Sequence, residues 1–450
     1  MLNLQIAVRR AAVFLDRGHW VLLILAAPFL LFPSPSRSLA LFVVPGLWLV
    51  ARLAGREPLP PTPFNGALLL LSLMVLVSLY ATYDIAVSLP KVAGMVLGLG
   101  VFYAVVRVGQ RPRGWWLCGL VFVTAGVGVA GLGLLGIRWI AKVGFLAPII
   151  SRLPSALVSL PGASEGLHPN EVAGALLWVI PVLVSFLRVS FTQLRNRLAV
   201  LGWCLAVAAT LFVTGVFVLT QSRGGYIGFA LAGLALILIA LPPHVRRFSL
   251  GGLAILVIVA VIVVSRYGAD PVLRELLGGA RASDPVLSLD SLEGRVEVWS
   301  RAIYAIQDFP FTGMGMNTFR RIVPVLYPLF LVSPDFDIAH AHNEFLQAAL
   351  DLGLPGLIAF LALYIGAFWV LFEIWRLAPR STLHAPQSWR FLVLGLGGGL
   401  FAHMLYGLTD AVALGAKPGL LLWMLLGLIA ALFEQARSSR PETVEGTARV

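Results

Sequence analysis

The sequence predicts an all-α integral membrane protein with about twelve transmembrane helices. Of its 450 residues, 59% are hydrophobic and only 12% are charged, whereas about 25% of the residues in a soluble globular protein are charged. The apolar residues form repeated runs of roughly 17 to 24, the length that crosses a hydrocarbon core of about 30 Å as a helix. The two-residue alternation of an outer-membrane barrel is not found, so helical spans are expected.

The apolar runs place the spans in order along the chain. Arg9, Arg10 and Arg17 precede the first run, as in a signal peptide. Because further spans follow, we expect an uncleaved first helix instead. The expected spans are 19–34, 39–54, 65–82, 89–108, 115–137, 168–188, 198–220, 224–242, 248–266, 344–375, 389–409 and 416–434.

Basic residues predict the orientation. With the N-terminus in the cytoplasm, the inner segments hold 19 of the 33 Lys and Arg residues, the short outer segments hold 7, and one long loop holds the other 7. This bias agrees with the positive-inside rule, so both termini are expected in the cytoplasm. The expected organisation is 1–266 with spans 1 to 9, 267–343 as an outer loop with short helices, and 344–450 with spans 10 to 12 and a cytoplasmic tail.

The net charge of +12 follows from this topology together with contacts to anionic lipid head groups. No basic domain or aromatic–basic platform indicates a nucleic-acid partner. Cys118 and Cys204 fall in predicted helices, so neither a disulfide framework nor a zinc site is expected. No Gly-rich phosphate loop of the Walker type occurs, which argues against an ATP site. A second outer segment, 138–167, has the amphipathic composition of a stretch that lies on the membrane.

The long outer loop contains its own order. Residues 291–306 have helical periodicity, and Arg295 and Trp299 are four residues apart, so they share a face. Asp308–Met316 then breaks the helix with Pro310 and two glycines, which predicts a turn where backbone approaches closely.

The polar run His340–Glu344 is the first candidate for chemistry. A neutral imidazole at the mouth of a cavity can accept a proton from a hydroxyl, and Asn343 suits the N-cap of the span that follows. The alternative is that the run only caps a helix at the level of the head groups. A metal ion bound by both histidines would need a third ligand, and no HExxH spacing exists, so no metal is predicted.

A second candidate is Gln221–Gly225, at the outer start of a span. Arg223 combines a fixed charge with free N–H groups and a helix dipole, which suits a phosphate or diphosphate; the alternative is an arginine that reaches for lipid head groups. Arg295 is a third candidate, although on a soluble helix it would be an ordinary surface residue. Weaker signals, also on the outer side, are Lys91, His168, Asn170, Glu171, His403, Tyr406 and Asp410.

Three features together resemble the O-antigen ligase and O-antigen polymerase superfamily of bacterial envelope glycosyltransferases. The first is Gln221-Ser-Arg-Gly-Gly at the start of a membrane helix. The second is Gly294-Arg295 followed by Trp299 and then by Pro310 and two glycines. The third is the ligase-type pattern His-Asn-x-x-Leu, six residues, Gly, which begins at His342 and ends at Gly353. The resemblance covers roughly 160–375 and is closest to the ligases.

The resemblance implies a GT-C-like helical fold in the bacterial inner membrane, with the site on the periplasmic face. It implies a glycan donor carried on undecaprenyl diphosphate and, for a ligase, a sugar hydroxyl of the lipid A-core as acceptor. Transfer would invert the anomeric carbon and would need neither a metal nor another cofactor. Arg223 and Arg295 would bind the donor diphosphate and His342 would be the base. His340, Asn343, Glu344, Gln221, Lys91 and Trp299 would support the site.

Other functions remain open at this point. A polymerase of the family would use the same donor but add the glycan to another polyprenyl-linked repeat, and a protein O-oligosaccharyltransferase would use a Ser or Thr of a protein. A lipid-linked glycan transporter is an alternative from another class. Transporters more often show repeated halves and ionisable residues near the membrane midplane, whereas here the polar groups gather on the outer side.

Overall fold

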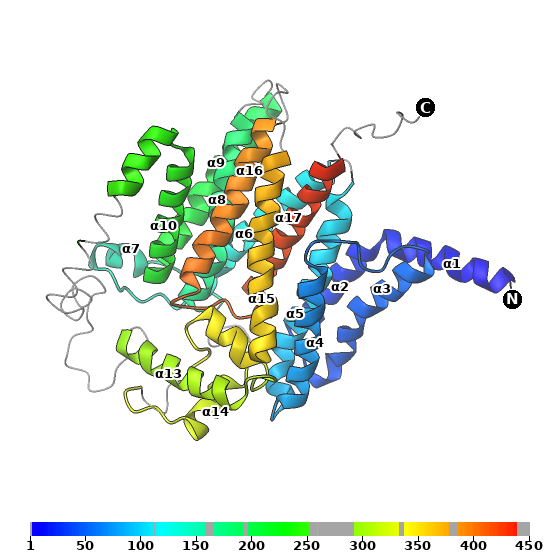
Figure 1. The fold of residues 1–450 in the computed structure, drawn as a ribbon, viewed down its shortest axis with the longest axis horizontal. Coiled ribbons are helices and arrows are strands. Elements are labelled where there is room, and N and C mark those ends of the chain that lie inside the picture. The colour runs from blue at the N-terminus through cyan, green and yellow to red at the C-terminus, as the bar shows by residue number, and fades with distance from the viewer. Residues whose placement is uncertain are drawn as a thin grey trace, which may run out of the picture.

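The computed structural model shows a nearly all-helical protein (Figure 1). It describes residues 2–111, 113–157, 166–191, 197–252, 259, 292–332, 337–377 and 386–438. Within these ranges, the β-type pairing consists of one isolated bridge between Ile137 and Leu167. The predicted helical class is therefore confirmed.

Eight of the described helices are long and apolar enough to cross a membrane, or nine if one bent pair counts as a single span. The expected number of twelve is not confirmed. The predicted span 248–266 lies largely outside the described residues, and the predicted span 39–54 begins within a 3-10 helix, η1 (Pro35–Phe42), before α3 (Val43–Leu53). The other helices of the bundle are α4 (Asn65–Ala81), α5 (Ile85–Gly109), α6 (Gly114–Gly136), α8 (Pro169–Phe191), α9 (Arg197–Leu219), α10 (Arg223–Ala240), α15 (Glu344–Leu377), α16 (Pro386–Tyr406) and α17 (Leu420–Ser438).

The bundle is built around α16 and α17. Helix α16 packs against α8 and α10, α17 packs against α5, and α15 packs against α4. Trp178, Tyr406 and Trp423 are among the largest fully buried side chains. A Cβ at Gly98 would lie 2.3 Å from the Trp423 indole nitrogen, so a glycine is needed where α5 meets this ring.

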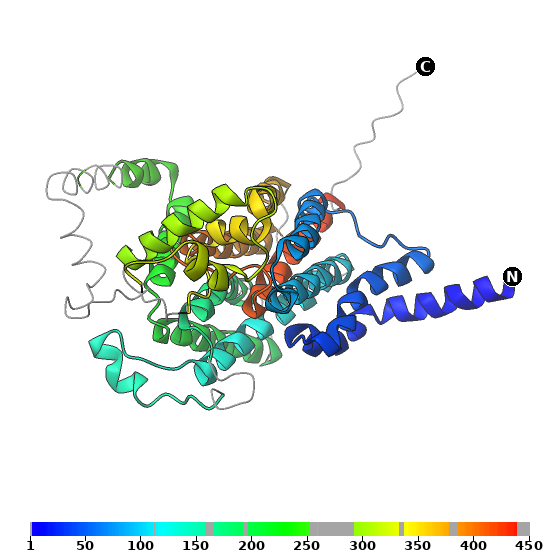
Figure 2. The ribbon, with the colours of Figure 1, turned by 90° about the horizontal axis from the view of Figure 1, so that it is seen from below.

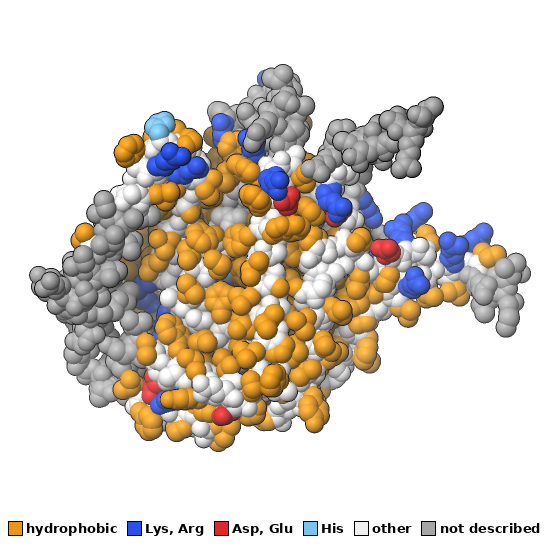
Figure 3. All heavy atoms as spheres, viewed as in Figure 1, with side chains coloured by type: hydrophobic (Ala, Val, Ile, Leu, Met, Phe, Trp, Pro, Cys, Tyr) orange, Lys and Arg blue, Asp and Glu red, His pale blue; other side chains and the backbone are white. Residues whose placement is uncertain are grey.

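The face of the bundle in Figure 3 is covered mainly by hydrophobic side chains. Large apolar residues on it and elsewhere are strongly exposed, for example Leu69 at 72% and Ile365 at 68%. A monomeric soluble protein rarely exposes so much contiguous apolar surface. Together with the long apolar helices, this surface defines a multi-pass membrane protein.

The N-terminal corner is formed by α1 (Leu2–Arg17) and α2 (His19–Leu31), whose axes bend by 69°. Asp16 lies buried at the bend. Its carboxylate oxygens are 2.8 Å from an Arg107 nitrogen and 2.9 Å from an Arg56 nitrogen. These ion pairs tie the corner to the end of α5.

The other end of the bundle carries α13 (Leu292–Asp308) and α14 (Phe319–Leu326), seen from below in Figure 2. The helix predicted for 291–306 is thus confirmed. Residues 138–157 contain only η2 (Gly144–Leu146) and α7 (Ala147–Ile150), so this part of the second outer segment is mostly non-helical. A small separate core joins α13 and α14 to the start of α15 through Val298, Ala302, Phe319, Val323, Ile338 and Leu350.

Candidate functional site

The site is built on the start of α15. The Asn343 side-chain oxygen accepts hydrogen bonds from the backbone N–H groups of Phe345 and Leu346, both at 3.0 Å. Asn343 is therefore the N-cap, as predicted. His342, just before the cap, has a left-handed backbone with φ of 48°, which costs energy in a non-glycine residue and is found where the surroundings enforce it.

Asp410, in the connection between α16 and α17, is the carboxylate on which both histidines converge. Its Oδ1 lies 3.4 Å from His342 Nδ1 and 3.8 Å from His340 Nε2. Its Oδ2 accepts a 2.6 Å hydrogen bond from the Asn170 side chain. Burial alone would raise the pKa of Asp410, but the His342 contact and the positive groups nearby outweigh it and hold that pKa below its usual range. Asp410 is thus a carboxylate at working pH.

These contacts determine where each imidazole carries its proton. The His340 Nδ1 accepts the backbone N–H of His342 at 3.2 Å, so its neutral ring has the proton on Nε2, toward Asp410. Burial, followed by the neighbouring His342 side chain, holds the pKa of His340 well below its usual value, so this ring stays neutral. Because Asp410 faces the Nδ1 of His342, it favours a proton on that atom and leaves His342 Nε2 as the acceptor. The 3.4 Å separation is long, as is common in catalytic contacts without substrate.

Two residues predicted for the site, Arg295 and Trp299, lie on one face of α13. The Trp299 indole N–H donates to the His342 backbone oxygen at 3.2 Å, and the Arg295 guanidinium donates to the Thr409 backbone oxygen at 2.7 Å. A second Arg295 nitrogen lies 3.5 Å from Asp410 Oδ2. The predicted shared face of Arg295 and Trp299 is confirmed, and both residues lie at the histidine run.

Arg223 is the first residue of α10 and is exposed. Ser222 caps this helix by accepting the Gly225 N–H. A Cβ at Gly224 would lie 2.5 Å from the Thr409 hydroxyl oxygen, so the start of α10 packs directly on the residue that Arg295 contacts. The flanking glycine of the motif therefore allows a helix start to reach the segment that carries Asp410.

Gln221 and Lys91, both predicted to support the site, have different roles in the structure. The Gln221 side-chain oxygen accepts the N–H groups of Lys142 and Val143 at 2.7 and 2.8 Å, and its amide donates to the Ile140 oxygen at 2.9 Å. Gln221 thus fixes segment 140–143 to the start of α10. Lys91, on α5, contributes a positive charge that lowers the pKa of His340.

The glycines of the resemblance have a physical role at a backbone crossing. Helix α15 is interrupted at Gly353, which has φ of 70°. A Cβ there would lie 2.5 Å from the Phe311 oxygen, and one at Gly313 would lie 2.7 Å from the Leu350 oxygen. The Met314 N–H also donates to Leu350 at 2.7 Å. The turn after α13 therefore crosses the interruption in α15 and fixes the short helical piece that follows His342.

His340, His342 and Asp410 offer one ligand atom each within 4.8 Å, which is close enough to hold a metal ion. The hydrogen bonds fit an ion poorly. A metal on His340 Nε2 would have to displace the proton that the backbone N–H on Nδ1 requires there. The set is better suited to holding protons, and the prediction of no metal stays a prediction.

Sequence reasoning assigned no role to Asp410 or Asn170 beyond their outer position. Asp410 contacts both histidines and Arg295, and Asn170, in the first turn of α8, fixes its second oxygen. An ionisable residue at the end of an apolar span was the available signal. Asp410 is 68 residues from His342 and 240 residues from Asn170 in the sequence, so no local pattern links them.

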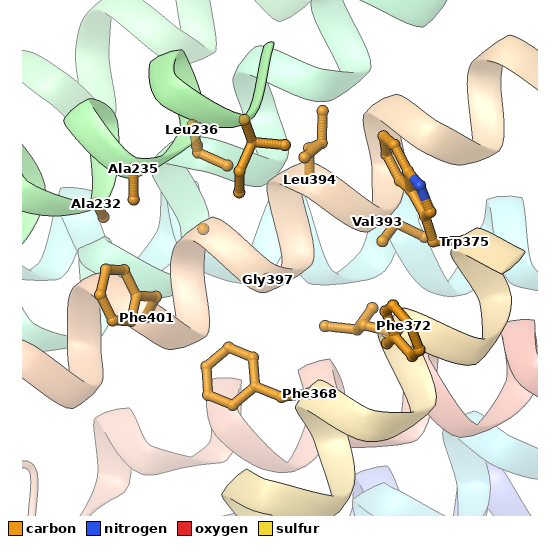
Figure 4. A pocket seen from close by; sticks show the side chains of 13 residues that line it. Ala232, Ala235, Leu236, Phe368, Phe372, Trp375, Val393, Leu394, Gly397 and Phe401 are labelled. Atoms are coloured by element: carbon orange, nitrogen blue, oxygen red, sulfur yellow. The ribbon is translucent and has the colours of Figure 1, made fainter. Parts of the chain in front are cut away.

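An apolar groove of about 440 Å³ runs between α10, α15 and α16. Figure 4 shows Leu236, Phe368, Phe372 and Trp375 lining it, with Gly397 leaving room on α16. The same three helices carry Arg223, the cap at Asn343 and the segment before Asp410 at one end. The groove lies farther along them, since its first lining residue on α10 is Ala232 and its lining on α15 begins at Phe368.

The fold and this site define a multi-pass helical membrane protein with a polar cluster of arginines, histidines and a carboxylate at one end. Residues 207–361 match a family model described as O-Antigen ligase, and this range contains Arg223, Arg295, His342 and Gly353. This stretch of the chain is therefore similar to the O-antigen ligase superfamily, as its motifs predicted. No curated protein matches the sequence. The family supports a membrane glycosyltransferase-like enzyme at the level of class.

Proposed function

We propose that the protein is an O-antigen ligase that transfers a glycan from undecaprenyl diphosphate to a sugar hydroxyl of the lipid A-core. The observation that carries this proposal is the convergence of His342, Asp410 and Arg295 from three separate segments, with the start of α10 packed on Thr409. The O-antigen ligase domain over 207–361 supports it.

The proposed reaction is a single inverting displacement. The acceptor oxygen forms a bond to the anomeric carbon of the donor sugar, and the bond from that carbon to the diphosphate oxygen breaks. His342 Nε2 takes the hydroxyl proton, while Asp410 holds the Nδ1 proton and stabilises the imidazolium that forms. The leaving diphosphate keeps the electron pair of the broken bond.

The positive groups are suited to that leaving group. A diphosphate already leaves readily, so Arg223 and Arg295 can offset its growing negative charge without a divalent cation. Arg223 stands at a helix N-terminus, where the helix dipole adds to its charge. The reaction takes its free energy from the donor bond.

The apolar groove suits the polyprenyl chain of the donor. Its lining is entirely hydrophobic apart from backbone, and it lies along α10, α15 and α16. A diphosphate at Arg223 would leave the attached chain to run along α10 from Arg223 to reach the groove, whose lining on this helix begins at Ala232. A polyprenyl chain would bury apolar surface there at about 25 cal/mol per Å².

The proposed location is the bacterial inner membrane, with the site periplasmic and both termini cytoplasmic. In this orientation 1–266 and 344–450 are membrane regions and 267–343 is a periplasmic loop. Most Lys and Arg visible in Figure 3 lie along the upper edge and on α1, at the opposite end from α13 and α14. This distribution agrees with the positive-inside rule.

The decisive experiment compares acceptors. Purified protein in liposomes is incubated with a polyprenyl-diphosphate glycan and either lipid A-core or a second polyprenyl-linked repeat, with and without a chelator. Transfer to lipid A-core that survives chelation supports a metal-independent ligase. Transfer only to the second repeat would establish a polymerase instead, and uptake or flipping of the glycan that persists in His342→Ala would indicate a transporter.

A further inference from the structure

A second pair of buried titratable groups lies next to the proposed base. Glu344 is 2% exposed and His403 is fully buried, and their Oε2 and Nε2 atoms are 2.9 Å apart. The Nδ1 of His403 lies 2.9 Å from the Gly174 backbone oxygen. The ring stacks on Trp178 with centroids 3.8 Å apart. The proposed transfer chemistry uses neither residue.

The contacts fix the number of protons that this pair holds. The Gly174 oxygen can only accept, so His403 Nδ1 carries a proton. A 2.9 Å contact between Nε2 and a carboxyl oxygen also requires a proton between them. The pair is therefore either an imidazolium with a carboxylate or an imidazole with a carboxylic acid. In both forms its net charge is zero.

The pair joins the start of α15 to the end of α16. The Glu344 backbone N–H donates to the Gly407 oxygen at 2.7 Å, and the Asn343 amide donates to the Leu408 oxygen at 2.9 Å. A Cβ at Gly407 would lie 2.7 Å from Glu344 Oε2, so the two segments are in direct contact. Asp410 follows three residues after Gly407. The same junction therefore carries the base on one side and its carboxylate partner on the other.

We propose that Glu344 and His403 are positioning residues that hold His342 at Asp410 through a single shared proton. This inference rests on the proposed function of His342. Among the residues that the structure describes, the titratable groups that face His342 are His340, Asp410 and His168, and Arg295 lies 3.5 Å from Asp410. Because the Glu344–His403 pair is neutral, its replacement by apolar residues removes no net charge from this set.

The test is the pH–rate profile of the double variant Glu344→Leu/His403→Phe. Removing both partners leaves no buried charge unpaired, which favours a folded protein, and the phenyl ring keeps the packing on Trp178. The turnover rate is expected to fall about tenfold or more, since misplacement by about 1 Å can cost about 100-fold. The acid limb of the profile is expected to move to lower pH, because a base is harder to protonate when it lies farther from a carboxylate.

The conservative variant Glu344→Gln is the matched control. Its amide can donate to the neutral His403 Nε2, so it is expected to restore both the turnover rate and the acid limb. An unchanged turnover rate in the double variant would overturn the inference. A lower rate with an unmoved acid limb would overturn it too, because it would show a role in stability only. A His342→Ala variant that still transfers glycan would instead refute the proposed function.

Discussion

Two buried carboxylates lie toward opposite ends of α5 and are held in different ways. Asp16, near Arg107, makes ion pairs of 2.8 and 2.9 Å with two arginines. Asp410 precedes the loop in which Gly415 packs on the Lys91 backbone, and its ionisable partners His342, Arg295 and His340 are 3.4 to 3.8 Å away. Asp16 stabilises the N-terminal corner of the fold. Asp410 instead contacts two histidines whose protons can move.

The arginines that contact these two carboxylates, Arg107 and Arg295, also differ in their contacts. Arg107 uses its guanidinium for Asp16 and for the backbone oxygens of Glu57 and Pro58, at 2.8 to 2.9 Å. Arg295 donates to the Thr409 backbone oxygen at 2.7 Å and lies 3.5 Å from Asp410, so its guanidinium is placed beside the histidines rather than at a corner of the fold. Burial alone would not have separated the two clusters.

The largest expected effect is on catalysis, from Asp410→Asn. The amide cannot stabilise an imidazolium and does not select the Nδ1 tautomer of His342, so the turnover rate is expected to fall about 1,000-fold. The acid limb should move to lower pH, because a negative charge next to the base is lost. Rates measured from pH 5 to 9 on folded protein test this. A rate within threefold of wild type would remove Asp410 from the mechanism.

Asp16→Asn is the same substitution at the other buried carboxylate. It leaves Arg107 without its buried partner, so the free energy of unfolding is expected to drop by about 3 kcal/mol. The turnover rate per folded molecule should stay as in wild type. Thermal unfolding in nanodiscs and a transfer assay on the same sample measure both quantities. If the turnover rate falls as far as in Asp410→Asn, the contrast between the two clusters fails.

Arg223→Gln tests whether Arg223 binds the donor diphosphate. Loss of the charge at the start of α10 is expected to raise KM for the donor about tenfold, roughly the contribution of one charge-assisted contact, with a smaller change in acceptor KM. Arg37→Gln, another exposed arginine far from α10 in sequence, is the control. Equal effects of the two substitutions would show that Arg223 only meets lipid head groups.

The smallest expected effect is a dependence of stability on pH. The pKa of His340 is lowered by burial, so below about pH 6.5 the unfolded chain binds a proton that the native protein does not. Stability should therefore decrease as pH falls below that value, by up to about 1.4 kcal/mol per pH unit. Unfolding temperatures at pH 5 and 7 should differ less in His340→Gln than in wild type. His244→Gln, at an exposed site, should keep the full difference.

Much of this arrangement could be predicted from the sequence. Apolar runs located most of the helices, because burial in a membrane needs length and hydropathy only. The sequence predicts the cap at Asn343 and the shared face of Arg295 and Trp299, because both depend on neighbours within a few residues. The glycines at 313 and 353 were noted as a pattern, and the structure adds the reason, a crossing of two backbones.

The rest depends on partners that are distant in sequence. The proton count of Glu344 follows from His403 and Gly174, and the tautomer of His342 follows from Asp410. Gln221 was grouped with the donor site, yet its side-chain amide binds the backbone of 140–143. No local pattern encodes such contacts. The 3-10 start of the second span was missed because its composition alone is apolar enough for a span.

His342 is proposed as the base of a metal-independent glycan transfer. The most direct measurement is single-turnover transfer from a labelled polyprenyl-diphosphate glycan to lipid A-core, by wild type and His342→Ala in liposomes containing a chelator. We predict full transfer by the wild type and a loss of about 1,000-fold or more in the variant, with donor binding retained. Transfer by His342→Ala at the rate of the wild type would contradict the role of His342 as the base. Loss of transfer by the wild type in the presence of the chelator would contradict a metal-independent reaction.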